Sequence, residues 1–235
     1  MARRDVVPLA SNVWRIPTAP ASLINSFALR DDDGGITLID AGLKRATGPI
    51  LAALAALDAK PADVRRIVMT HSHSDHAGGL PALAAATGAG IHSHERESVY
   101  LRDGRMPVGR GLGPRLVARI GSRLVRPVTV AEEFRDGDVM PVAGGLRVVH
   151  TPGHSPGHVS LLHEPSGVLI TGDAVFNIRG LRWPLPWFCT DPALNRRSAD
   201  RLGDLDFEIA AFTHGVEIRH HARQAVRAFL RGRQR

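Results

Sequence analysis

Residues 70–76 read THSHSDH, and no other stretch of the 235-residue chain holds so many metal-ligand side chains. Val64, Ile67, Val68 and Met69 before this run predict a buried strand over 64–69, and the Ala-rich segment 80–86 after it predicts a helix. In open α/β sheets, ligands collect beyond the carboxyl ends of the strands. The run therefore lies where a binding site is expected.

The spacing within the run indicates two metal positions. While the chain stays extended, His71, His73 and Asp75 point to one side, and His76 points elsewhere. His71 and His73 can then hold one metal, and Asp75 and His76 a second one a few ångströms away, as two-metal hydrolytic sites require. The alternative interpretation is a solvated polar loop that is rich in histidine.

The composition limits the class of protein. With 43% hydrophobic and 23% charged residues, it is typical of a globular protein, and the length suits one α/β domain over residues 1–235. No apolar run has the length of a signal-peptide core or a membrane span, so we expect a cytoplasmic protein without stable membrane insertion. Cys189 is the only cysteine, which excludes an intrachain disulfide.

The net charge of +7 permits a polyanionic partner. However, the sequence shows no recognition-helix motif, aromatic stacking set or zinc finger to accompany this charge. We therefore expect a small-molecule substrate rather than nucleic acid.

Ligand-type side chains also follow other predicted strands. Periodicity predicts strands at 13–16, 23–29, 36–40, 90–92, 146–150, 159–162, 168–171 and 208–212, and helices at 47–57, 95–100 and 220–230. The side chains after strand ends include Asp40, His154, His158, Asp173 and His214. Asp40 is either a helix cap or a carboxylate that orients a ligating histidine.

The collected candidates are five imidazoles and two carboxylates: His71, His73, Asp75, His76, His154, Asp173 and His214. This set suits zinc and, less selectively, iron or manganese. The physical interpretation is a pair of divalent ions with one carboxylate and one solvent oxygen between them. Such a solvent molecule can be a hydroxide at neutral pH and attack a carbonyl or phosphoryl centre.

The segment 102–127 breaks the regular pattern. Glycines and prolines between 104 and 114 indicate a loop. From residue 115 onward, Leu116, Val117, Ile120, Leu124 and Val125 form an apolar face, and Arg115, Arg119, Arg123 and Arg126 a basic one. We expect an amphipathic helix that covers the site or pairs two subunits as a homodimer; the alternatives are contact with a membrane surface and a plain solvated helix.

The ordered motifs resemble the metallo-β-lactamase-fold hydrolase superfamily. The resemblance rests on His71-Ser-His73-Ser-Asp75-His76, Thr-Pro-Gly-His154, Thr-Gly-Asp173 and Thr-His214-Gly, and it extends over about residues 13–225. It implies an αββα sandwich of two mixed sheets with two metals at the rim. One metal would be held by His71, His73 and His154, and the other by Asp75, His76 and His214, with Asp173 between them.

The resemblance also implies roles for the remaining candidates. Asp40 matches the family's Asp-x-Gly and would orient a ligand, and His158 matches a second histidine with a structural role. Asp75 and Asp173 would act directly in catalysis. Asp173 stands where common zinc β-lactamases have a cysteine, so we do not expect antibiotic hydrolysis.

The implied activity is hydrolysis of a small ester, thioester or lactone, as in glyoxalase II-type thioesterases and acyl-homoserine lactonases. Only 21 residues follow His214, too few for the glutathione-binding domain of glyoxalase II, and Tyr100 is the only tyrosine, which weighs against close identity with the lactonases. The alternatives are a phosphodiesterase or nuclease, and a persulfide dioxygenase with a single iron.

Overall fold

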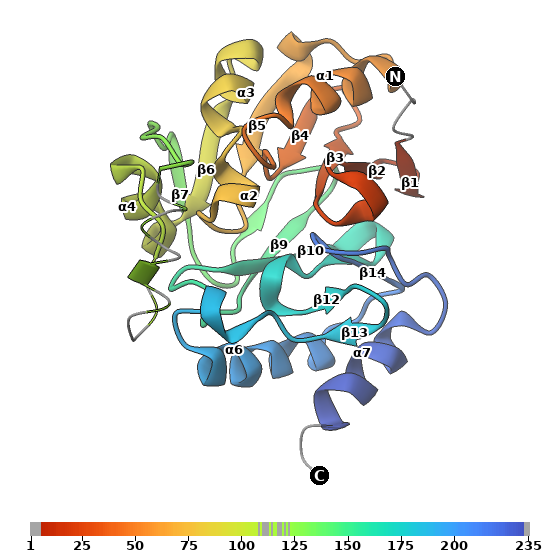
Figure 1. The fold of residues 1–235 in the computed structure, drawn as a ribbon. Coiled ribbons are helices and arrows are strands. Elements are labelled where there is room, and N and C mark those ends of the chain that lie inside the picture. Colours follow the sequence, from red (N-terminus) through yellow and green to blue (C-terminus); the bar gives the residue numbers. More distant parts are fainter. Residues whose placement is uncertain are drawn as a thin grey trace.

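The chain folds around two β-sheets that face each other (Figure 1). A computed structural model describes residues 6–107, 109, 113, 115, 116, 119, 121 and 123–232. The larger sheet contains, in spatial order, β1 (Val7–Ala10), β2 (Val13–Pro17), β3 (Asn25–Arg30), β4 (Ile36–Ile39), β5 (Val64–Val68), β6 (Gly90–His94) and β7 (Glu132–Phe134). Neighbours from β1 to β4 are antiparallel, and neighbours from β4 to β7 are parallel.

The smaller sheet places three strand ends at one edge. Its order is β14 (Ile209–Ala211), β11 (Val168–Ile170), β10 (Val159–His163), β9 (Leu146–His150) and β8 (Val139–Met140). Because β10 is antiparallel to both β9 and β11, and β14 is parallel to β11, strands β9, β11 and β14 share one direction. The loops that follow these three strands therefore leave the same edge.

Side-chain alternation along the strands separates two cores. Leu38 and Ile67 pack in the cluster that includes helix residues, whereas Ile39 and Val68, one position further along, pack between the sheets. The carboxyl-terminal halves of these strands are buried on both faces, which explains why each strand ends in consecutive apolar residues.

Helices cover the outer faces of both sheets (Figure 1). Helices α1 (Thr47–Ala56) and α3 (Leu80–Thr87) pack on the larger sheet through Leu54 and Leu83. Helices α6 (Pro192–Ala199) and α7 (Ala222–Arg231) pack on the smaller sheet, where Val226 and Phe212 share one cluster. The predicted αββα sandwich is confirmed.

Each predicted strand and helix outside residues 102–127 agrees with an observed element to within three residues at either end. The sequence did not predict β1, β7, β8, α6 or the hairpin of β12 (Phe176–Asn177) and β13 (Leu181–Arg182). The missed strands are two to four residues long, too short to show a period of two. Helix α6 does carry a start signal, since the Asp191 carboxylate caps it by accepting a hydrogen bond from the Leu194 N–H.

The segment 102–127 follows helix α4 (Glu95–Asp103). The predicted amphipathic helix depends on Val117 and Ile120, which lie outside the described residues. It therefore stays a prediction. Within the part of the chain that the structure describes, no helix has the length and hydrophobicity needed to cross a bilayer.

Candidate metal centre

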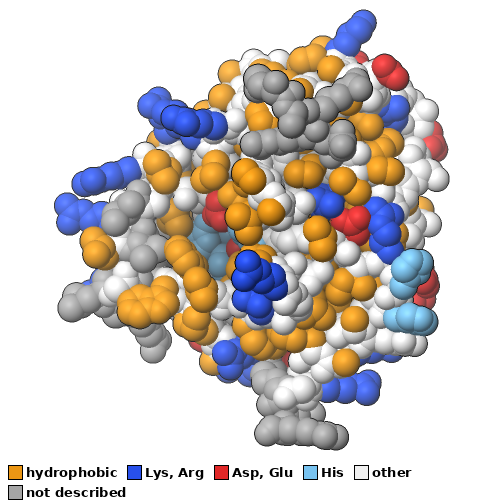
Figure 2. All heavy atoms as spheres, turned by 45° about the vertical axis from the view of Figure 1, so that its right-hand side comes forward, with side chains coloured by type: hydrophobic (Ala, Val, Ile, Leu, Met, Phe, Trp, Pro, Cys, Tyr) orange, Lys and Arg blue, Asp and Glu red, His pale blue; other side chains and the backbone are white. Residues whose placement is uncertain are grey.

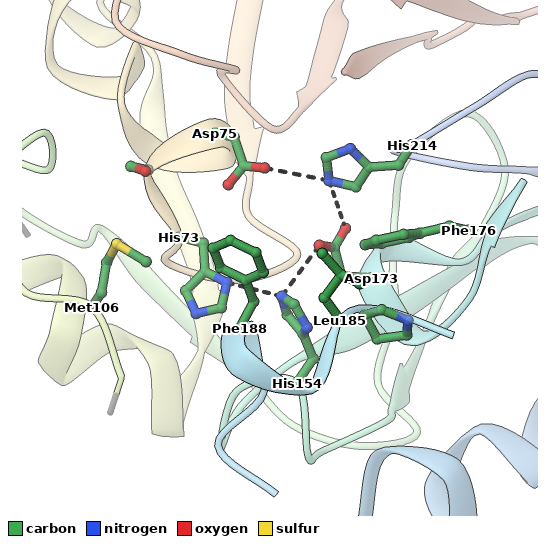
Figure 3. A pocket seen from close by; sticks show the side chains of 11 residues that line it. His73, Asp75, Met106, His154, Asp173, Phe176, Leu185, Phe188 and His214 are labelled. Carbon is green, nitrogen blue, oxygen red and sulfur yellow. Dashed lines mark hydrogen bonds and ion pairs between the residues drawn. The ribbon is translucent and has the colours of Figure 1, made fainter. Parts of the chain in front are cut away.

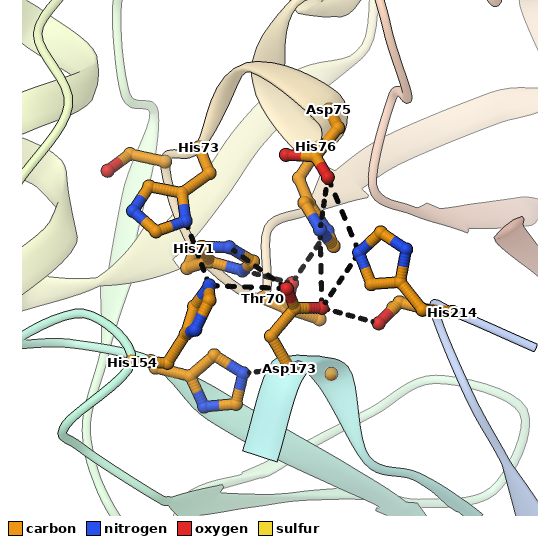
Figure 4. A network of polar contacts seen from close by, with 12 residues as sticks. Thr70, His71, His73, Asp75, His76, His154, Asp173 and His214 are labelled. Atoms are coloured by element: carbon orange, nitrogen blue, oxygen red, sulfur yellow. Dashed lines mark hydrogen bonds and ion pairs between the residues drawn. The ribbon is translucent and has the colours of Figure 1, made fainter. Parts of the chain in front are cut away.

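The loops at the rim of the two sheets bring all seven candidate ligands together (Figure 4). His71 and His73 follow β5 in the larger sheet, and Asp75 and His76 come next, in the short helix α2 (Ser74–Ala77). The remaining candidate ligands follow strands of the smaller sheet: His154 after β9, Asp173 after β11 and His214 after β14. The centre is thus assembled between the sheets.

Helix α2 corrects one prediction. The expected extended row from His71 to Asp75 is wrong beyond His73, because the chain turns into α2 at Ser74. The turn is stabilised by a hydrogen bond from the Ala77 N–H to the His73 carbonyl (2.8 Å). The chain directly after α2 packs closely on the loop after β4, since a Cβ on Gly79 would lie 2.4 Å from the Ala41 carbonyl oxygen. As a result, Asp75 and His76 lie in one helical turn rather than on opposite sides of an extended chain.

The ligand atoms form overlapping groups. Those of His71, His73 and His154 all lie within 4.8 Å of one another, and so do those of Asp75, His76 and His214. We call these the first cluster and the second cluster. The two clusters belong to one centre, because His71 and His76 also form a group of the same size with Asp173.

Asp173 faces both clusters with different oxygens. Its Oδ2 lies 3.2 Å from His154 Nε2 in the first cluster. Its Oδ1 lies 3.3 Å from both His76 Nε2 and His214 Nε2 in the second. One carboxylate is therefore placed to serve two metal positions (Figure 4).

The residues fit divalent metal ions. The Nε2 atoms of His71 and His76 are buried and make no hydrogen bond. Buried polar atoms are almost always satisfied, so two such ring nitrogens within one candidate ligand group fit a site that holds a cation. Imidazole and carboxylate donors suit zinc, iron and manganese.

Asp40 holds the ring of one candidate ligand, His76. Its Oδ2 accepts a hydrogen bond from His76 Nδ1 (2.8 Å), and Oδ1 accepts one from the Thr70 N–H (2.8 Å). This arrangement leaves His76 Nε2 free to face the centre and is the usual partnership of a metal-ligating histidine with a carboxylate. Asp40 is not a helix cap, because α1 begins after Ala46.

The metallo-beta-lactamase superfamily matches residues 19–214. The chain belongs to this superfamily. It is similar to the uncharacterized protein YobT of Bacillus subtilis (30% identity; 94% of this chain and 97% of the relative are covered). It is also similar to an N-acyl homoserine lactonase of Bacillus cereus (31% identity; 67% of this chain and 58% of that protein). Among solved structures, a metallo-beta-lactamase family protein of Thermus thermophilus has a TM-score of 0.73 and 28% identity, covering 97% of this chain and 81% of that one.

His158 supports the centre of this superfamily member without entering the ligand groups. Its Nε2 accepts a hydrogen bond from the Asp173 N–H (2.7 Å), while Nδ1 lies 3.0 Å from the Thr151 carbonyl oxygen. An imidazole that donates through Nδ1 and accepts through Nε2 must be neutral. Burial lowers the pKa of His158 well below its usual value, as this role requires. His158 thus fixes the backbone of Asp173.

The clusters differ in their preferred protonation. Burial lowers the pKa of His71 well below its usual value and that of His73 to about 3, so both are neutral near pH 7. Burial acts the same way on His76 and His214, but the nearby carboxylates, Asp173 foremost, outweigh it. They raise the pKa of His76 well above its usual value and that of His214 to about 10.

This difference predicts proton release on metal binding. A ligating imidazole must be neutral, so filling the second cluster near pH 7 should release about two protons, from His76 and His214. His71 and His73 should release none. Calorimetric titration of metal-free protein, in buffers that differ in ionisation enthalpy, measures this number for each ion. Release of the same number of protons by both ions would contradict the assignment of protonated histidines to the second cluster.

The sequence did not reveal two features of the site. The buried Glu97 on α4 contacts the loops that carry the first cluster, and no local pattern in the sequence pointed to it. Met106 and Leu185 line the cavity above the candidate ligands (Figure 3). Phe176 and Phe188 also line this cavity.

Proposed function

We propose that the chain is a hydrolase that uses two divalent ions, zinc in the first instance, to cleave a small ester, thioester or lactone with an apolar acyl group. The observation that carries this proposal is the position of Asp173, whose two oxygens face different ligand clusters. Divalent ions at these positions supply Lewis acidity and make water nucleophilic at neutral pH.

The cavity above the ligands favours an uncharged substrate. It has a volume of about 300 Å³, and ligands including His73, Asp75 and His214 form its floor (Figure 3). Its walls are Met106, Phe176, Pro184, Leu185 and Phe188. Figure 2 shows hydrophobic side chains around an opening in which histidine side chains are visible. An apolar wall beside a polar floor suits an acyl chain whose carbonyl reaches the metals.

The lining of the same cavity argues against the phosphodiesterase alternative. Among the described residues that line it, none is Lys or Arg. Protein sites for phosphate groups commonly use these side chains. Among the described residues, positive charge is therefore not concentrated where the substrate would react.

The protein offers no thiol nucleophile at this site. Cys189 is buried beside His154, and burial raises the pKa of its thiol to about 12. The thiol stays protonated near pH 7, and water is the remaining nucleophile. Similarity to the lactonase favours a lactone or ester, but Tyr100 does not line the cavity, so a tyrosine that polarises the carbonyl is not available there.

Metal analysis combined with substrate turnover tests the proposed function. About two zinc ions per chain, with turnover of acyl esters, thioesters or lactones and none of bis(p-nitrophenyl) phosphate, is the expected result. One iron per chain with oxygen uptake and no hydrolysis would replace this proposal by the dioxygenase alternative. Cleavage of the phosphodiester alone would favour the phosphodiesterase.

The apolar wall predicts a dependence on acyl length. Replacing Phe188 by Ala should lower kcat/KM for a long-chain acyl substrate by about tenfold, because roughly 50 Å² of apolar contact contributes about 1.3 kcal/mol. The loss should fall on KM, since this contact exists in both the bound substrate and the transition state. An acetyl substrate should show almost no change. Val99→Ala is the matched control, because Val99 is half exposed on α4 and does not line the cavity.

A further inference from the structure

Besides Asp40, a further buried carboxylate outside the ligand clusters contacts the loops that carry the first cluster. Glu97 lies on α4 and is 0% exposed. It is not part of any ligand group, and it does not line the substrate cavity. Burying a carboxylate is costly unless hydrogen bonds compensate it, so its partners indicate its role.

The two oxygens of Glu97 bind two different loops. Oε2 accepts hydrogen bonds from the Ser72 N–H (2.9 Å) and the Ser72 hydroxyl (2.6 Å). Oε1 accepts a hydrogen bond from the Gly157 N–H (2.9 Å). Burial raises the pKa of the Glu97 carboxyl, and these bonds oppose the rise by stabilising the charged form.

The two loops carry the whole first cluster. Ser72 lies between the ligands His71 and His73, in the loop after β5 of the larger sheet. Gly157 lies three residues after the ligand His154, in the loop after β9 of the smaller sheet. Glu97 is thus a bridge between two sheets at the point where one metal needs ligands from both.

The backbone at this bridge is closely packed. A Cβ on Gly157 would lie 2.7 Å from the Glu97 backbone nitrogen and 2.9 Å from its Cγ. Glycine at this position therefore lets the His154 loop approach α4 closely enough for the Gly157 N–H to reach the carboxylate. The glycine at position 157 is thus the residue type that the contact with Glu97 requires.

We propose that Glu97 is a positioning residue that sets the geometry of the first cluster by holding the loop of His71 and His73 at a fixed separation from the loop of His154. This inference rests on the metal binding in the proposed function and is independent of the substrate. A residue that only stabilises the fold would change the unfolding temperature without changing the affinity of one ion relative to the other.

Glu97→Gln tests the bridge with almost no change in size. The Gln side chain has one acceptor oxygen, so its amide NH₂ must face an N–H donor at one of the two loops. We expect the affinity of the first cluster for zinc to fall by about 10–100-fold, the range seen when partners of metal ligands are replaced. The second cluster should keep its affinity. Competition with a chromophoric chelator measures both constants, and the visible spectrum of the cobalt-substituted protein reports the geometry of each site.

Ser98→Ala is the matched control. Ser98 is the neighbouring residue on α4, equally buried, and its hydroxyl lies 2.8 Å from that of Ser93 rather than near a metal loop. This variant should lose some thermal stability and keep both zinc affinities. If Glu97→Gln does not fold, Ser72→Ala removes only one bond of the bridge and should weaken the first cluster about fivefold.

The outcomes separate this inference from the proposed function. Two zinc ions in the wild-type chain, with unchanged affinities and cobalt spectrum in Glu97→Gln or its substitute Ser72→Ala, would overturn the positioning role alone. Equal weakening in Ser98→Ala would also overturn it, because general destabilisation would then explain the effect. A folded wild-type chain that binds no divalent ion would overturn the proposed function and the inference together.

Discussion

Replacing Asp173 by Asn is expected to lower turnover by at least about 10³-fold and to weaken the binding of both metal ions. The Asp173 oxygens lie 3.2 Å from His154 Nε2 and 3.3 Å from His76 Nε2, so one side chain serves both clusters. Asn keeps the shape but loses the charge and one acceptor oxygen. A loss of about 4 kcal/mol in transition-state stabilisation corresponds to this factor.

Asp173→Asn should also change how the stability of the metal-free protein depends on pH. The Asp173 carboxylate raises the pKa of His214 to about 10, although burial opposes it. A histidine with a raised pKa stabilises the fold below its unfolded pKa of about 6.5, and this stabilisation is lost as the pH rises to about 10. Asp173→Asn should therefore lower the unfolding temperature of the metal-free protein most near pH 6 and least near pH 10.

Two measurements check this prediction. Thermal unfolding of chelator-treated protein across this pH range gives the stability difference, and metal content after dialysis gives the occupancy. Normal occupancy by two ions with wild-type turnover would contradict the assigned position of Asp173. A stability difference that grows with pH would contradict the electrostatic argument.

The sequence predicted the parts of the site that follow buried strands. Strands β4 and β5 both end in consecutive buried apolar residues, so a polar residue soon after each marks a strand end at the sheet rim. This is why Asp40 and His71 could be found from sequence alone. The fold was predicted from the order of the motifs, through their resemblance to a known superfamily.

The remaining features depend on contacts between distant segments. Asp75 and His76 were expected in an extended chain, but the packing of Gly79 against Ala41 belongs to the tertiary structure and cannot be read from a local period. Glu97 looked like an ordinary charged helix residue, because its partners lie 25 and 60 positions away in the sequence. Long-range hydrogen bonds of this kind leave no local signal.

Asp75→Ala should abolish most of the turnover and leave a folded protein. The side chain of Asp75 is 32% exposed, against 4% for Asp173, so its removal exposes little new buried surface. Ala is also a better helix former than Asp, which favours α2. We therefore expect a folded protein whose metal-free unfolding temperature falls, because Asp75 helps to raise the pKa of His76 and His214, but falls less than in Asp173→Asn. We also expect the loss of one bound ion and a fall in turnover of about 10²–10³-fold.

This variant decides between a binuclear and a mononuclear mechanism, because Asp75 belongs only to the second cluster. The first cluster, with His71, His73 and His154, remains intact and should still bind one ion. If hydrolysis depends on both ions, Asp75→Ala loses its turnover together with the second ion. The turnover of Asp75→Asn, which keeps one oxygen, should then lie between that of Asp75→Ala and that of the wild type. Full hydrolytic activity with a single ion, or oxygen uptake that survives the substitution, would instead assign the chemistry to the first cluster alone.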